Sequence, residues 1–312
     1  MSEGFERGTH RTRDGYELAT YRWTPDGEPR ALLQIVHGMA EHAARYDHVA
    51  RAFTAEGFLV HAHDHRGHGR SVPAGEAPGH IGDDEGWQKL VDDVHERAAA
   101  LREEHPTLPR AIFAHSMGGY AAQTLLGQNP DDADAWAISG NGGKPPFIAA
   151  IGRLVARAER LRLGKRGASA LIRKLTFEDF NKAFEGRTDC DWLSRDPLEV
   201  DKYVADPLCG HDVSIETWIQ LLDVIPTLTK AAHLAPIPRE KPIYVVAGSE
   251  DTSIGKAQGA RNLLEAYRAD GLRDVTLQLW PGGRHEMVNE TNRDEVIGAL
   301  VQWVRAALKL DD

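Results

Sequence analysis

Short apolar runs recur along the chain and alternate with amphipathic segments. The apolar runs predict buried strands at 31–36, 58–63, 111–114, 135–139, 242–247 and 275–280. The segments between them predict helices near 43–56, 85–104, 117–128, 256–269 and 291–309. Strands that are apolar throughout are typical of a sheet covered on both faces. Their alternation with helices therefore predicts an α/β fold with a doubly wound, mostly parallel sheet.

The beginning and the middle of the chain depart from this alternation. Alternating positions between Tyr16 and Trp23 predict hairpin strands ahead of a turn at 25–27. The stretch 141–235 is far longer than a crossover needs, and it predicts amphipathic helices such as 147–163 and 214–230. We expect a helical cap, inserted after the sixth strand, over a pocket at the carboxyl edge of the sheet. Residues 1–140 and 236–312 would then form the core.

Composition and charge exclude several classes of protein. Hydrophobic residues make up 41% of the 312 residues and charged residues 27%, which is an ordinary globular composition. The net charge of −10 argues against a nucleic-acid partner, which needs a basic surface. The sequence shows no signal peptide and no apolar run of the roughly 20 residues that span a bilayer. The two cysteines, Cys190 and Cys209, are expected to be reduced and buried in a cytoplasmic protein. The oligomeric state stays open.

The strongest chemical signal is a serine between a buried strand and a helix. Strand 111–114 is followed by His115, Ser116, Met117 and then Gly118 and Gly119. Glycines allow the close backbone approach that a tight strand-to-helix turn requires, and such a turn exposes the serine hydroxyl above the sheet. The usual motif is G-x-S-x-G, and Ala114 replaces its first glycine here. We interpret Ser116 as a nucleophile.

A serine nucleophile needs a base, and the base needs an orienting acid. Asp251 follows strand 242–247, and His285 follows strand 275–280. The order Ser116, Asp251, His285 is the one that this kind of fold uses, with His285 as general base and Asp251 as its partner. Glu250 is the main competitor for the role of the acid.

Acyl transfer also needs donors for the developing oxyanion. The backbone N–H of Met117, directly after the nucleophile, is one expected donor. The loop after strand 31–36 supplies the second, for which we predict the N–H of Met39 because Gly38 permits close approach. Gly38, His115 and Gly118 are expected to line the substrate pocket.

Histidines crowd the segment HAHDHRGHGRS at 61–71. A metal site is one interpretation, because histidine and aspartate are good ligands. No second cluster of ligands accompanies the segment. We therefore predict no metal, and instead a loop cross-linked by hydrogen bonds of His, Asp and Arg.

Together these motifs resemble the α/β-hydrolase superfamily, and within it the monoacylglycerol lipase and lysophospholipase group of serine aminopeptidase-like hydrolases. The pieces that carry the resemblance are HGMAEH at 37–42 with RY at 45–46, DHRGHGRS at 64–71, HSMGG at 115–119, Gly248 with Asp251, and His285-Glu286. The resemblance implies the α/β-hydrolase fold and hydrolysis of acylglycerol or lysophospholipid esters without a cofactor. It also implies Ser116, Asp251 and His285 as the triad and Met39 and Met117 as oxyanion donors. Ala114 departs from the family pattern.

Three alternatives stay open for the activity and the partners. The same triad would serve a peptidase or a thioesterase. A non-catalytic ligand-binding module on this scaffold would be expected to lose a triad residue, and none is missing. The predicted cap helix is also rich in cations between Arg153 and Lys174, with Glu159 as the acid among them. This segment predicts either weak contact with an anionic membrane surface or, as we favour, a solvated helix that covers the pocket.

Overall fold

A computed structural model describes residues 4–143, 147–184 and 186–310, without the side chains of 147–149. The strands in these ranges are β1 (Glu6–Arg11), β2 (Glu17–Trp23), β3 (Ala31–Val36), β4 (Phe58–His63), β5 (Arg110–His115), β6 (Ala135–Ser139), β7 (Ile243–Gly248) and β8 (Val275–Trp280). The helices that flank them are α1 (Asp47–Ala55), α2 (Gly86–Glu104), α3 (Ser116–Gln128), α10 (Ala257–Ala269) and α11 (Arg293–Ala307). All the strands and flanking helices expected from the apolar pattern are present, with ends shifted by a few residues at most.

The described strands form one eight-stranded sheet in the order β1-β2-β4-β3-β5-β6-β7-β8. The pairs from β4–β3 through β7–β8 are parallel, whereas β1–β2 and β2–β4 are antiparallel. The mostly parallel, doubly wound sheet is thus confirmed. The hairpin differs from the expectation, because its turn joins β1 to β2 and lies before Glu17, not at 25–27.

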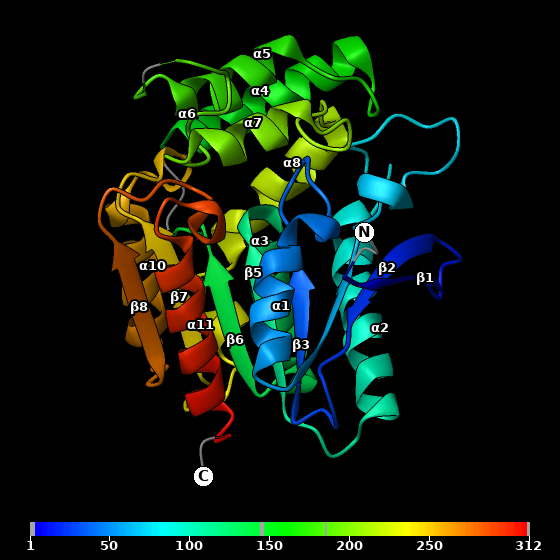
Figure 1. Ribbon diagram of the computed structural model, residues 1–312. Coiled ribbons are helices and arrows are strands. Elements are labelled where there is room, and N and C mark those ends of the chain that lie inside the picture. Colours follow the sequence, from blue (N-terminus) through cyan, green and yellow to red (C-terminus); the bar gives the residue numbers. More distant parts are fainter. Residues whose placement is uncertain (1–3, 144–146, 185, 311–312) are drawn as a thin grey trace.

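Successive side chains of the central strands enter two separate cores. In β5, Ile112 packs with the core under α2, α3 and α10, and Phe113 packs with the core under α1 and α11. Val245 and Val246 of β7 divide in the same way. Figure 1 shows the helices on the two faces of the sheet. This division explains the uninterrupted apolar runs, since both faces of each strand are buried.

Between β6 and β7 the described chain is helical. It forms α4 (Phe147–Leu163), α5 (Ala170–Arg173), a π-helical turn (Lys174–Glu178), α6 (Asp179–Asn181), α7 (Pro197–Ala205), α8 (Ile215–Val224) and α9 (Ala231–Leu234). Helices α4–α7 lie beyond the carboxyl ends of the strands, and α8 packs against both α4 and α2 (Figure 1). We call residues 147–184 and 186–224 the cap. The expected helix 214–230 ends early, because Pro226 cannot continue the backbone ladder and a 3₁₀ turn follows.

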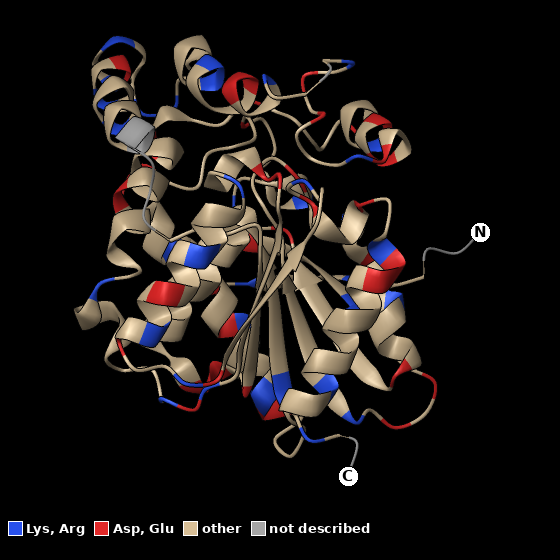
Figure 2. Cartoon of the chain, turned by 90° about the vertical axis from the view of Figure 1, so that its left-hand side faces the viewer, with Lys and Arg blue, Asp and Glu red and all other residues tan. Residues whose placement is uncertain are grey.

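The basic segment of the cap is paired with acids from other parts of the chain. Arg157 binds Asp223, Arg160 binds Glu216, Arg166 binds Asp83, and Arg173 binds Asp212. Figure 2 accordingly shows both signs of charge close together on the helices at the top of the molecule. Among the described residues no helix has the length and apolar character needed to cross a membrane.

Candidate active site

Ser116 lies at the junction of β5 and α3, in a backbone conformation that residues with a Cβ rarely adopt. Its φ is +52°, in the left-handed region. A Cβ at position 118 would lie 2.2 Å from the carbonyl oxygen of His37, and one at position 119 would lie 1.9 Å from Oδ1 of Asn141. Gly118 is therefore required for α3 to begin so close to the end of β3, and Gly119 leaves room for the side chain of Asn141. This is the sharp turn that the sequence predicts at the serine.

The side chains of Ser116, His285 and Asp251 form one hydrogen-bonded chain. Oγ of Ser116 lies 2.9 Å from Nε2 of His285, and Nδ1 of His285 donates to Oδ2 of Asp251 at 2.9 Å. The carboxylate of Asp251 is fully buried, and His285 is almost so. Glu250 instead pairs with Lys256 at the surface, so that Asp251 is the acid that reaches the imidazole.

The charges of Asp251 and His285 stabilise each other. Burial opposes ionisation of Asp251, but the charge of His285 and the hydrogen bonds from His285 and Ser253 hold the pKa of the carboxyl below its ordinary value. Burial alone would lower the pKa of His285, yet Asp251 raises it above the ordinary 6.5. The imidazole is thus built to accept a proton from a neighbour and to hold it.

Ser253 joins the hydrogen-bonded network of Asp251 and His285, although nothing in the sequence singled it out. Its hydroxyl donates to Oδ1 of Asp251 at 2.6 Å and lies 3.0 Å from Nδ1 of His285. Its backbone N–H donates to the same carboxylate oxygen, which makes Asp251 the cap of the short 3₁₀ turn Thr252–Ile254. An aspartate followed two residues later by serine after a strand is a turn signal that could have pointed to this contact.

The loop after β3 approaches the serine from the other side. A Cβ on Gly38 would lie 2.7 Å from Oε1 of Glu41 and 3.3 Å from Cβ of Ser116, so a side chain there would crowd both residues. The N–H of Gly38 donates to Oε1 of Glu41 at 2.5 Å. The next amide of the loop is the N–H of Met39. Met117 follows Ser116 directly and is buried.

Glu41 joins this loop to the segment that follows His285. Its carboxylate also accepts from Tyr46 and Arg45, and Arg45 in turn donates two hydrogen bonds to Glu286, at 2.8 and 2.7 Å. Burial opposes ionisation of Glu286, but Arg45 brings the pKa of its carboxyl down to about 2. One arginine therefore ties the serine-facing loop to the histidine-bearing loop.

A cavity of about 410 Å³ opens above Ser116. Gly38, Met39, His115, Met117 and His285 contribute to its floor. Gly118, which we had expected in the lining, instead packs under β3. The walls come from the cap and are mostly apolar, with Val155, Phe177, Phe180, Trp192, Trp218 and Leu221 among the lining residues. Such a cavity is suited to an apolar chain whose polar end lies at the serine.

The histidine-rich segment forms the hydrogen-bonded loop that we expected. Asp64 accepts from Tyr21 Oη and from the backbone N–H groups of Ala43 and Arg70. His65 is bonded to the backbone and ring of His37. Burial lowers the pKa of His65 to about 4, so the imidazole is neutral at neutral pH.

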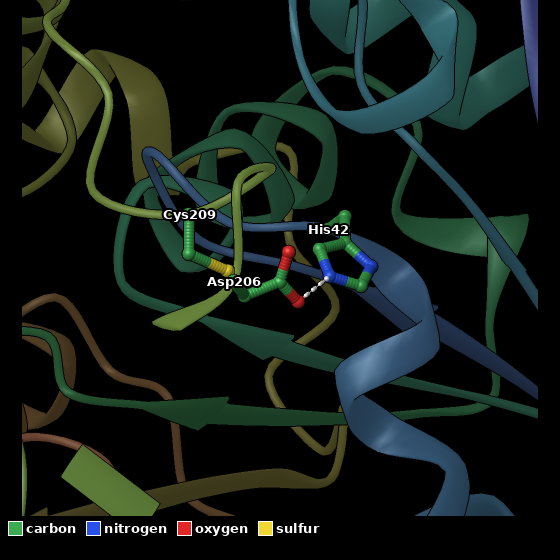
Figure 3. A group of neighbouring side chains, drawn as sticks. All are labelled: His42, Asp206 and Cys209. Carbon is green, nitrogen blue, oxygen red and sulfur yellow. Dashed lines mark hydrogen bonds and ion pairs between the residues drawn. The ribbon is translucent and has the colours of Figure 1, made fainter. Parts of the chain in front are cut away.

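Among the described residues, a group of side chains whose spacing could hold a metal ion lies outside the histidine-rich segment. They are His42, Asp206 and Cys209, whose ligand atoms are all within 4.8 Å of one another (Figure 3). Nε2 of His42 and Oδ2 of Asp206 are hydrogen-bonded to each other at 2.8 Å. Both cysteines are free, with Cys209 buried and Cys190 half-buried, and burial raises the pKa of the Cys190 thiol to about 11. We interpret the group as a polar contact between cap and core.

Comparison with known proteins identifies the family. Residues 27–292 match the family described as "Serine aminopeptidase, S33". The chain is 33% identical to the monoacylglycerol lipase of Mycolicibacterium smegmatis over 90% of each chain. It is 31% identical to the monoglyceride lipase of Mus musculus, over 93% of this chain and 88% of that one. The crystal structure of a thermostable carboxyl esterase from Bacillus coagulans has the same fold, with a TM-score of 0.88, 24% identity, and 98% and 99% of the two chains covered. This chain therefore belongs to the S33 serine aminopeptidase family of α/β hydrolases, in the group of monoacylglycerol lipase-like ester hydrolases.

Proposed function

We propose that the protein is a serine hydrolase that cleaves carboxylic esters through an acyl-enzyme. The observation that carries this proposal is the 2.9 Å contact between Oγ of Ser116 and Nε2 of His285 at the floor of the cavity. Ser116 attacks the ester carbonyl while His285 takes its proton, and Asp251 stabilises the imidazolium. The N–H groups of Met39 and Met117 hold the oxyanion. His285 then protonates the leaving alcohol. In the second half of the reaction His285 takes a proton from water, which attacks the acyl-enzyme and releases the acid and Ser116.

The substrate that best fits the site is a monoacylglycerol. The apolar cap residues Phe177, Trp192 and Trp218 offer a wall for one acyl chain. Glu41 and Glu286 also line the cavity and supply a polar region for a small alcohol. The relatives named monoacylglycerol and monoglyceride lipase support this choice. A lysophospholipid is the second substrate, with a bulkier and charged headgroup beside the same two acids.

A fluorophosphonate probe tests the nucleophile, and a substrate panel tests the class. We expect wild type to be labelled and Ser116→Ala not to be labelled. Ser139→Ala is the matched control, because Ser139 is a buried serine at the end of the neighbouring strand β6. The panel compares p-nitrophenyl esters of increasing chain length, a monoacylglycerol, a lysophospholipid, a thioester and a peptide amide. A folded wild type that resists the probe and cleaves nothing in the panel would contradict the proposal.

A further inference from the structure

The loop that carries the proposed oxyanion donor contains a residue in an unfavourable conformation. Ala40 directly follows Met39 and has a φ of +53°. This left-handed region is disfavoured for residues with a Cβ, and it persists only where surrounding contacts hold it. Ala40 is buried, with 1% of its surface exposed, so solvent does not supply those contacts.

The contacts come from the cap. The carbonyl oxygen of Ala40 accepts from Oη of Tyr203 at 3.0 Å and from the N–H of Gly210 at 2.9 Å. Two residues further along the loop, His42 is bonded to Asp206 (Figure 3). Residues 203–210 thus bind the loop at two positions, just after the donor residue Met39.

Tyr203 is itself firmly held. It is buried, and the guanidinium group of Arg45 lies over its ring, 4.8 Å from the centroid. Arg45 is the residue that ties Glu41 to Glu286. The phenol hydroxyl is therefore presented to Ala40 by a side chain with little freedom to move.

We propose that Tyr203 is a positioning residue, which holds Ala40 in the left-handed conformation and thereby orients the N–H of Met39 in the oxyanion hole. This inference rests on the proposed function of the site. It gives the cap a second role, because a cap residue would set the geometry of the catalytic loop in addition to walling the cavity. The phenol acts through Ala40 and does not need to touch the substrate.

Removing the hydroxyl should therefore affect the transition state more than substrate binding. In Tyr203→Phe the ring and its contact with Arg45 stay, but the Ala40 carbonyl keeps only the Gly210 donor. Loss of a complete oxyanion donor costs about 10²- to 10³-fold in kcat, so a misoriented one should cost less, about 5- to 30-fold. KM should change less than about twofold, since the ester binds before the oxyanion forms.

Two further variants separate positioning from a general loss of stability. Tyr267→Phe is the matched control, because Tyr267 is also buried and its hydroxyl donates to Gln123 outside the cavity. Ala40→Gly supplies rescue, since glycine adopts a positive φ without steric cost. We expect the loss caused by Tyr203→Phe to shrink at least about threefold when residue 40 is glycine. The affinity of an alkyl trifluoromethyl ketone, which places an oxyanion in the hole, should fall in parallel with kcat.

Three results would overturn the inference. They are an unchanged kcat in Tyr203→Phe, an equal loss whether residue 40 is alanine or glycine, and a rise in KM with kcat unchanged. A crystal structure of Tyr203→Phe tests the same point without any assay, because Ala40 should leave the left-handed region and an unaltered φ would contradict us. If wild type itself hydrolyses no ester, the proposed function fails, and this structural measurement still decides the conformational part.

Discussion

The indole ring of Trp192 lies against the imidazole of His285, with the two ring centroids 4.8 Å apart. His115 lies near the imidazole as well, at 4.7 Å between centroids. The backbone adds to this contact, because the N–H of His285 donates to the carbonyl of Trp192. A residue of the cap thus contacts the proposed general base directly.

This contact predicts an effect of Trp192 on the protonation of His285. An indole face attracts a cation, by up to about 2 kcal/mol where water is excluded, so it favours the imidazolium. In Trp192→Leu the pKa of His285 should fall by up to about 1.5 units, and kcat should fall because the transition state carries the charged ring. Trp192→Phe keeps an aromatic face and serves as the control. The pH dependence of kcat/KM measures both, and an identical acid limb in all three proteins would count against this role.

The raised pKa of His285 predicts the pH dependence of wild type. His285 must be neutral to accept the proton of Ser116, so activity should be lost as the pH falls through its pKa. Because that pKa is raised from 6.5, the midpoint of the acid limb should lie above 6.5. Glu286 contributes to the rise, so Glu286→Gln should move the midpoint to lower pH. A midpoint well below 6.5 in wild type would show that the environment of His285 differs from the one described.

Substitutions at positions 250 and 251 compare the two acids that the sequence left in competition. Asp251→Asn removes the charge that stabilises the imidazolium, and we expect kcat to fall roughly 10³- to 10⁴-fold. Glu250→Gln disrupts an exposed pair with Lys256 and should change kcat less than about twofold. Steady-state hydrolysis of a p-nitrophenyl ester measures both. The reverse order of effects would reassign the acid.

The paired cations of the cap predict weak dependence on membrane charge. Because Arg157, Arg160 and Arg166 are already bound to acids, little positive charge is left to attract anionic lipid. Sedimentation with vesicles should therefore give similar binding with and without anionic lipid, at low and at higher salt. Asp223→Asn removes the carboxylate that pairs with Arg157 and should raise the share of the protein bound to anionic vesicles. Strong, salt-sensitive binding of wild type would instead support the membrane-docking interpretation.

The sequence predicted most of the strands, the flanking helices and the proximity of Ser116, Asp251 and His285, but it missed most other contacts between distant segments. Strands such as β3 and β7 could be predicted from the sequence, because both of their faces are buried and most of their residues are therefore apolar. β1 was missed because its residues are polar and mostly exposed, as suits an edge strand. The acids that neutralise the basic segment of the cap, among them Asp83 and Asp223, lie far from that segment in the chain. Likewise, the proximity of Trp192 and Tyr203 to the site depends on how the cap folds back. A cytoplasmic location stays a prediction of the sequence.

The contacts of residues 191–195 limit how substrate reaches Ser116. Arg284 donates to the carbonyls of Asp191 and Ser194, the N–H of Glu286 donates to Leu193, and Arg195 pairs with Glu290. A rigid swing of the entire cap would break this set and drag the general base out of place. Entry and exit are therefore expected to use the side of the cavity next to α4, where the lining residue Ile151 is 44% exposed. The proton-transfer machinery would then be left undisturbed throughout the cycle.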